Sequence, residues 1–179
     1  MLFRSLWDPT YTETSWITQW STLGPIQLLP RLRGKITQNY PGTKLAITEY
    51  NYGGGNHISG GIAQADVLGI LGRDGVFAAN VWRLASDESF IQGGFRMFRN
   101  FDGMNRSFGD TSVRATTDNI AGSSVYASLD SADSNVLYVV AINKTNAPLP
   151  VTMQLARVLP GATATTYQLT SANSTPQLA

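Results

Sequence analysis

The residue types that could do chemistry gather where a strand-like run meets a loop rich in glycine. Residues 44–49 are β-rich and end on Glu49, and the polar residues that follow read as a loop. Alternate side chains of a strand share a face, so Glu49 is expected to point the same way as Leu45 and Ile47, at the rim of the region that they fill. The C-terminal end of a strand is where α/β barrels place catalytic groups. The alternative is an ordinary strand-end glutamate that faces water.

The residues after Glu49 could form the wall of such a site. They include Tyr50, Asn51, Tyr52 and His57. A nucleophilic carboxylate must be ionised, and hydrogen-bond donors beside it favour that state. We therefore predict that Tyr50, Asn51 and Tyr52 bind the substrate. His57 is expected to make hydrogen bonds within the loop.

Tryptophans supply flat rings that either fill a core or stack on a ligand. Trp16 and Trp20 are four residues apart in a polar segment, so on a helical turn they would form one aromatic face. Asn80 and Trp82 share a strand face and would lie at the same rim as Glu49 if the strands are parallel. All three tryptophans are candidate substrate-binding residues. Simple packing is the alternative for Trp16 and Trp20.

The composition excludes several classes of partner. The chain has 179 residues, a formal net charge of +1 and 14% charged residues, so nothing indicates nucleic acid, an anionic membrane or a highly charged substrate. With no cysteine, one histidine and no His-Glu-x-x-His arrangement, we expect no disulfide, no metal site and no cofactor. The apolar runs are too short to span a bilayer, and the N-terminus does not read as a signal peptide.

A phosphate-binding turn is a further alternative, because three glycines follow a strand and precede a helix. The spacing argues against it. If Gly53 and Gly55 are the first two glycines of a dinucleotide motif, the third position falls on Ile58, and no Gly-Lys-Ser/Thr run occurs. The glycines are expected to allow a tight loop and a close approach of ligand.

The first hundred residues predict a parallel α/β arrangement of three strands and three helices. The expected strands cover residues 2–7, 44–49 and 76–82, and the expected helices begin at Leu28, Ile58 and Glu88. This is fewer than a closed eight-stranded barrel needs, and an open sheet of this size leaves its edges unpaired. We therefore interpret the chain as a fragment of a larger fold.

Beyond residue 105 the sequence changes to short runs rich in Thr, Ser and Val, separated by turns. This texture is typical of an antiparallel β-sandwich. We expect strands at residues 112–117, 123–129, 136–143, 151–157 and 164–169, with residues 171–179 loosely ordered. The predicted domains are residues 1–104, α/β, and residues 105–179, all β.

Three stretches carry a resemblance to a known family: SLWDPTY at residues 5–11, LAITEYNYGGG at 45–55 and ISGGIAQADVLG at 58–69. They resemble glycoside hydrolase family 44. The resemblance implies a secreted, bacterial endo-β-1,4-glucanase or xyloglucanase of retaining mechanism, acting on a β-1,4-linked glucan and monomeric in its full-length parent. It implies a fold in which the C-terminal portion of a TIM-like (β/α)8 barrel is followed by a β-sandwich.

By the same resemblance, Glu49 matches the catalytic nucleophile and Trp16, Trp20 and Trp82 match sugar-stacking residues. The family's acid/base glutamate lies on an earlier barrel strand, so the resemblance places the acid/base on an N-terminal half that is absent from this chain. Retaining glycosidases need two carboxyls about 5 Å apart. Asp8 and Glu13 are expected to lack the desolvated setting that raises the pKa of a general acid. The isolated chain is therefore expected to be inactive.

A non-catalytic carbohydrate-binding module is the main alternative. In that case the sandwich and the tryptophans would bind glycan, and Glu49 would hydrogen-bond a hydroxyl. The position of the aromatic residues discriminates the two, since all four tryptophans precede residue 83. This favours a cleft on the α/β part.

Overall fold

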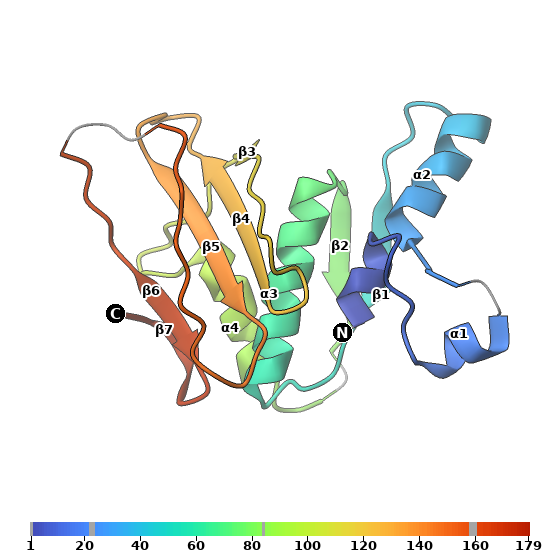
Figure 1. Cartoon of the computed structure of the whole chain (residues 1–179), viewed down its shortest axis with the longest axis horizontal. Helices are drawn as coiled ribbons and strands as arrows, with labels where there is room; N and C mark the ends of the chain where they lie inside the picture. The colour runs from blue at the N-terminus through green and yellow to red at the C-terminus, as the bar shows by residue number, and fades with distance from the viewer. Residues whose placement is uncertain (1, 22–23, 84, 158–160) are drawn as a thin grey trace. The chain divides into compact units, whose positions relative to one another are not determined.

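The strand that carries Glu49 is half of a parallel pair. In the computed structural model, β1 (Ala46–Tyr50) pairs in parallel with β2 (Ala78–Val81), and the helix α3 (Ile58–Arg73) makes the connection between them (Figure 1). This confirms the predicted strands at these positions, the helix between them and the parallel order. The structure describes residues 2–21, 24–83, 85–157 and 161–179.

The chain divides into two compact units that do not follow its order. The first unit comprises Met1–Tyr52 and Ile70–Leu84, and the second comprises Gly53–Gly69 and Ala85–Ala179. The helix α3 therefore contributes residues to both. The predicted boundary after residue 104 stays a prediction. Taken together, the described residues combine helices with parallel and antiparallel sheets.

The first unit begins with a 3-10 helix, η1 (Leu2–Leu6), so the predicted strand at residues 2–7 is wrong. Phe3 and Leu6, three residues apart, are both buried, which is the spacing that places side chains above one another on a 3-10 helix. Arg4 then reaches Asp8 with a guanidinium nitrogen 2.6 Å from a carboxylate oxygen. Over only six residues, the apolar spacing of a 3-10 helix and that of a strand cannot be distinguished from the sequence.

Two further helices complete this unit, α1 (Trp16–Ser21) and α2 (Leu28–Asn39). The helix α2 confirms the one predicted to begin at Leu28, whereas α1 forms in a segment for which the sequence predicted no helix. Pro30 lies in the first turn of α2, where a helix tolerates it, and Leu29 is fully buried. The helix ends where the backbone N–H of Tyr40 donates to the carbonyl oxygen of Ile36 at 2.8 Å.

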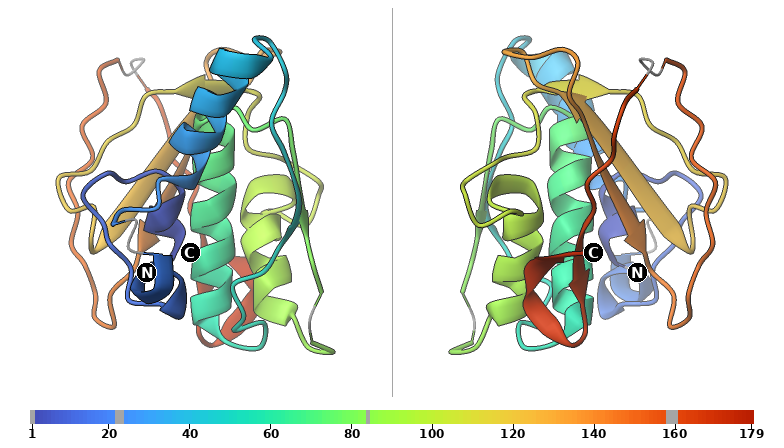
Figure 2. Two further views of the ribbon diagram at one scale, coloured as in Figure 1. Left: turned by 90° about the vertical axis from the view of Figure 1, so that its right-hand side faces the viewer. Right: turned by 90° about the vertical axis from the view of Figure 1, so that its left-hand side faces the viewer.

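The second unit holds two antiparallel sheets. One contains β3 (Thr111–Val113), β4 (Ser123–Leu129) and β5 (Leu137–Asn143) in that order, and the other contains β6 (Tyr167–Thr170) and β7 (Asn173–Leu178). The helix α4 (Ser89–Arg99) contacts β6 and β7, and Figure 2 shows this hairpin beside it. The antiparallel order and the strands at residues 123–129 and 136–143 are as predicted.

Two predictions for this unit are wrong. Residues 151–157 form no strand, although Val151, Met153 and Leu155 alternate with polar residues. These three side chains are at least 44% exposed, so no neighbour within the described ranges covers the apolar face that the pattern offers. Residues 171–179 are not loose, because β7 pairs with β6 and the N–H of Ala179 donates to the carbonyl oxygen of Thr166 at 2.9 Å.

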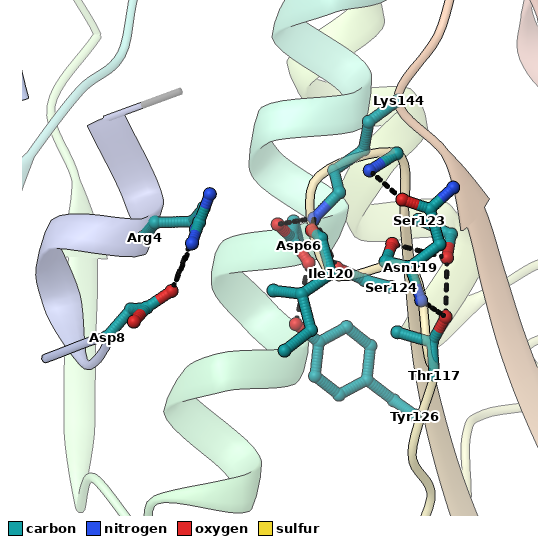
Figure 3. A network of polar contacts seen from close by, with 11 residues as sticks. Arg4, Asp8, Asp66, Thr117, Asn119, Ile120, Ser123, Ser124, Tyr126 and Lys144 are labelled. Atoms are coloured by element: carbon teal, nitrogen blue, oxygen red, sulfur yellow. Dashed lines mark hydrogen bonds and ion pairs between the residues drawn. The ribbon is translucent and has the colours of Figure 1, made fainter. Parts of the chain in front are cut away.

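A buried polar network joins α3 to the three-stranded sheet within this unit (Figure 3). The Tyr126 hydroxyl donates to Asp66 Oδ1 at 2.6 Å, and Lys144 Nζ lies 3.7 Å from Asp66 Oδ2. Lys144 also donates to the carbonyl oxygen of Ile120 at 2.8 Å and to Ser124 Oγ at 2.9 Å. Because these donors surround the carboxylate, Asp66 can be buried with only 1% of its surface exposed.

Two kinds of feature are absent from the part of the chain that the structure describes. None of its helices is long and apolar enough to cross a membrane. No group of three or more His, Cys, Asp or Glu side chains among the same residues could hold a metal ion.

Candidate active site

Glu49 lies one residue before the end of β1, at a break in the register of the parallel pair. Ile47 pairs with Ala79, but Tyr50 pairs with Val81, so two residues of β1 lie opposite one residue of β2. This is the two-against-one arrangement of a β-bulge, which re-aims side chains at the end of a strand. The alternation that begins at Ile47 therefore does not continue to Glu49.

The bulge determines which side chains lie on the same face of the strand pair as Glu49. Leu45 and Ile47 are half-buried, whereas Glu49 is exposed, so the prediction that Glu49 shares their face is wrong. Asn80 and Trp82 are exposed in β2 and directly after it, while the residue between them is half-buried. Glu49 thus lies with Asn80 and Trp82 on the exposed side of the pair, as predicted for the common rim. Sequence parity alone could not detect the extra residue.

Two hydrogen bonds tie the ends of the two strands together. The N–H of Trp82 donates to the carbonyl oxygen of Tyr50 at 2.8 Å. The side-chain amide of Asn51 donates from Nδ2 to the carbonyl oxygen of Trp82 at 2.6 Å. Asn51 therefore fixes the position of the residue that follows β2. This is a structural task that its sequence position did not indicate.

Two tyrosines flank this corner. The rings of Tyr50 and Tyr52 lie 6.1 Å apart between centroids, at an angle of 53°. Burial raises the pKa of the Tyr52 phenol to about 12, and the nearby Tyr50 and Glu13 act in the same direction. Tyr52 therefore stays protonated at any physiological pH, so its hydroxyl remains a hydrogen-bond donor.

The other two candidate tryptophans lie on α1. Trp16 is 72% exposed and Trp20 is 83% exposed. Together with Gln19 they line a shallow, open hollow. The two residues thus lie on a helical turn, the condition under which their spacing gives one aromatic face, and both rings are exposed to solvent. The two exposed rings therefore form an apolar patch on α1, and their role in substrate binding stays a prediction.

His57 belongs to the second unit, with the glycine-rich loop. Its Nδ1 accepts from the N–H of Ser59 at 3.2 Å and lies 2.9 Å from Ser59 Oγ, so it makes local hydrogen bonds as expected. Gly54 adopts a positive φ of 66°, and a Cβ on Gly60 would lie 2.1 Å from the carbonyl oxygen of Gly54. These glycines are explained by backbone geometry and close packing.

Two carboxylates are buried where the sequence predicted polar, solvated loop positions. Asp8 is 3% exposed and Glu13 is 6% exposed, so the expectation that they lack a desolvated setting is wrong. Burial alone would raise the pKa of Asp8, but hydrogen bonds from Thr10 and the Arg4 guanidinium together hold it below its ordinary value. Glu13 accepts hydrogen bonds from Ser5 Oγ at 2.8 Å and from Ser15 Oγ. A short polar segment of sequence does not show whether its side chains will be buried by their hydrogen-bond partners.

The chain is similar to known endoglucanases and xyloglucanases. The chain is 46% identical, over 154 residues, to Endoglucanase A of Paenibacillus lautus, a match that covers 86% of this chain and 22% of the enzyme. It superposes with a TM-score of 0.82 and 43% identity on a Paenibacillus polymyxa xyloglucanase of glycoside hydrolase family 44 solved with xyloglucan. That match covers 98% of this chain and 35% of the xyloglucanase.

A family 44 endoglucanase from Clostridium thermocellum gives the same result, with a TM-score of 0.83 and 43% identity over 98% of this chain and 34% of the enzyme. A scan against family models gave no match. The resemblance to glycoside hydrolase family 44 is therefore confirmed. The chain is a relative of these endoglucanases and xyloglucanases, and it spans about a third of the length of the solved enzymes.

Proposed function

We propose that this chain is part of a retaining glycoside hydrolase that cleaves β-1,4-glucan chains, with Glu49 as the nucleophile. The first unit would supply the last strands and helices of a TIM-like barrel, and the antiparallel sheets would belong to a β-sandwich. The observation that carries the proposal is the position of Glu49, exposed at a bulged strand end beside Trp82 and Asn80, in a chain with family 44 relatives.

The chemistry follows from a two-step displacement. An ionised Glu49 carboxylate would attack the anomeric carbon and form a glycosyl ester, while a second carboxyl protonates the departing glycosidic oxygen. Water would then release the sugar as that second residue accepts a proton. The protonated Tyr52 and the amide of Asn51 would keep the corner around the nucleophile polar and ordered.

The second carboxyl is proposed to come from a part of the parent protein outside this chain. Asp8 and Glu13 are buried carboxylates of the first unit that lie close in sequence to α1. Both already have hydrogen-bond partners within the chain. Asp8 binds Arg4 and Thr10, and Glu13 binds Ser5 and Ser15. The pKa of Asp8 lies below its ordinary value, which makes Asp8 a poor proton donor, and both oxygens of Glu13 already accept hydrogen bonds from serines.

The proposed substrates are neutral glucans such as cellulose and xyloglucan, together with the soluble derivative carboxymethyl cellulose. Exposed rings at Trp16, Trp20 and Trp82 suit stacking on flat sugar faces, and the chain carries a net charge of only +1. One relative, a xyloglucanase, was solved with xyloglucan. Secretion of the parent, as the resemblance implies, is part of the same proposal.

One experiment tests this function and separates it from a non-catalytic binding module. The purified chain is assayed on carboxymethyl cellulose and xyloglucan alone and after mixing with a separately made polypeptide that carries the remaining barrel strands of a family 44 enzyme. We expect turnover only in the mixture. Glu49→Gln should lower it by more than about a hundredfold, since it removes the nucleophile and keeps the shape.

The matched control is Asp74→Asn, which neutralises a carboxylate paired with Arg73 at 2.9 Å in the turn between α3 and β2, before β2 begins rather than where it ends. It should leave turnover unchanged. Turnover by the chain alone would contradict the external acid. Glycan binding without turnover in any mixture would favour the binding module.

A further inference from the structure

The second unit contains a hollow of about 350 Å³ where the end of α4 meets the β6–β7 hairpin. All of its lining residues belong to this unit. Its walls come from the last turn of α4, the loop that follows it and the facing hairpin of β6 and β7. The lining residues on the α4 side are Arg96, Asn100, Phe101, Asp102 and Gly103. Those on the hairpin side are Tyr167, Thr175, Pro176, Gln177 and Leu178.

One wall of the hollow is aromatic. The rings of Phe101 and Tyr167 lie 5.2 Å apart between centroids at 57°, and Phe101 also packs on Tyr138 at 6.0 Å. All three side chains are half-buried, so each ring is held by neighbours on one side and keeps an accessible part on the other. Rings held in this way can receive the apolar face of a ligand without first losing freedom of motion.

The other walls carry hydrogen-bonding groups. The guanidinium of Arg96 makes no ion pair or hydrogen bond with any other residue that the structure describes, so it can donate to a ligand. Gln177 lines the hollow with a side chain whose Nε2 donates to the carbonyl oxygens of Thr175 at 3.2 Å and Pro176 at 2.9 Å. Its amide oxygen is thereby held in a constant orientation.

The loop after α4 is rigidly built. Asn100 Oδ1 accepts from the N–H of Asn105 at 2.7 Å. Asp102 Oδ1 accepts from the N–H of Met104 at 2.8 Å and of Arg106 at 3.2 Å. The Asp102 side chain is 1% exposed, and its Oδ2, 3.7 Å from Arg106 Nε, accepts no hydrogen bond from the described residues. A loop held by two side chains keeps the hollow open in the absence of ligand.

We propose that this hollow is a second glycan-binding site, which takes one or two sugar units of a neutral β-glucan. Its volume suits a ligand of that size, and its aromatic wall and mixed polar groups suit a ring with one apolar face and many hydroxyls. Among the lining residues, the positive Arg96 and the negative Asp102 cancel, so a highly charged ligand is not favoured. The choice of a glucan rests on the proposed function, whereas the site itself rests on the geometry above.

The test uses cellotetraose and the full 179-residue chain. Binding is measured by calorimetry in a background with Trp16→Ala, Trp20→Ala and Trp82→Ala, which removes the exposed tryptophans of the first unit. We expect residual binding that Arg96→Gln weakens about tenfold, as for the loss of one hydrogen bond to a charged group. The matched control is Arg99→Gln, on the same helix but outside the hollow, which should not change the residual binding.

Hydrogen exchange on the wild-type chain gives a second readout that does not depend on the folding of the variants. With cellotetraose we expect slower exchange in residues 96–106 and 167–178. Protection confined to residues 46–52 and 78–82 would overturn the second site and leave the proposed function intact. Protection of the hollow alone would support the second site and count against the tryptophan-lined one. Residual binding that is absent, or equal in Arg96→Gln and its background, would also overturn the inference.

Discussion

The side-chain amide of Asn51 donates to the backbone carbonyl of Trp82 at 2.6 Å, so the residue after β1 holds the residue after β2. Glu49 precedes this contact by two residues, at the bulge of the same strand. Because catalysis depends on placing the nucleophile within a fraction of an ångström, loosening this corner should matter more for activity than for stability.

We therefore expect Asn51→Ala to lower kcat/KM of the assembled enzyme about tenfold or more, and to change the free energy of unfolding by less than about 1 kcal/mol. Steady-state kinetics and urea unfolding measure the two effects. Asn39→Ala is the control, because Asn39 donates in the same way to the carbonyl oxygen of Lys35 at 2.8 Å on the exposed part of α2. Equal activity of the two variants would contradict a positioning role for Asn51.

Trp82, which is 49% exposed, should contribute to glycan binding. Trp82→Ala is expected to weaken cello-oligosaccharide and xyloglucan-fragment binding by about 1–3 kcal/mol, the range of other ring-stacking contacts. Calorimetry measures the change. Phe77→Ala removes a ring of 64% exposure just before β2, where it packs under Lys44, and should leave affinity unchanged. If Trp82→Ala also binds normally, Trp82 serves packing instead.

Lys144 should be essential to the second unit. Lys144→Met removes the cation 3.7 Å from the buried Asp66 carboxylate, and leaving that charge uncompensated should destabilise the unit by about 3–5 kcal/mol. Tyr126→Phe, which removes the hydroxyl that donates to Asp66, should cost less, about 1–3 kcal/mol. Urea unfolding followed by circular dichroism gives both values. Lys35→Met, an exposed position on α2, should change stability by less than about 0.5 kcal/mol. A similarly small effect at Lys144 would contradict its role in compensating the buried carboxylate.

Asp8 should make the stability of the first unit depend on acid. Its pKa in the folded chain lies below its ordinary value, so ionised Asp8 stabilises the fold above the pKa of the unfolded chain, about 3.9. This contribution is lost as the pH falls through the lower folded pKa. The stability difference between the wild-type chain and Asp8→Asn should therefore be present at about pH 7 and vanish at strongly acidic pH. Denaturation at several pH values tests this, and a pH-independent difference would contradict it.

The sequence by itself determined the elements whose pattern is long and local. The helices at α2, α3 and α4, the strand ending near Glu49 and the alternating strands β4 and β5 all follow from runs of residues that repeat one period over two or more turns or pairs. The order of residues at 5–11, 45–55 and 58–69 was also sufficient to indicate the family. The domain boundary and the catalytic assignment remain predictions.

Only the tertiary structure decided the features that depend on a distant partner. Residues 151–157 alternate as a strand should, yet none of the residues that the structure describes pairs with them, whereas residues 173–178 form β7 because they pair with β6 and contact α4. The register of β1 against β2 inserts one extra residue and so turns Glu49 away from Ile47 and toward the side of Asn80. A strand's period is local, but its register and its bulges arise from hydrogen bonds to another strand, which no single run of residues records.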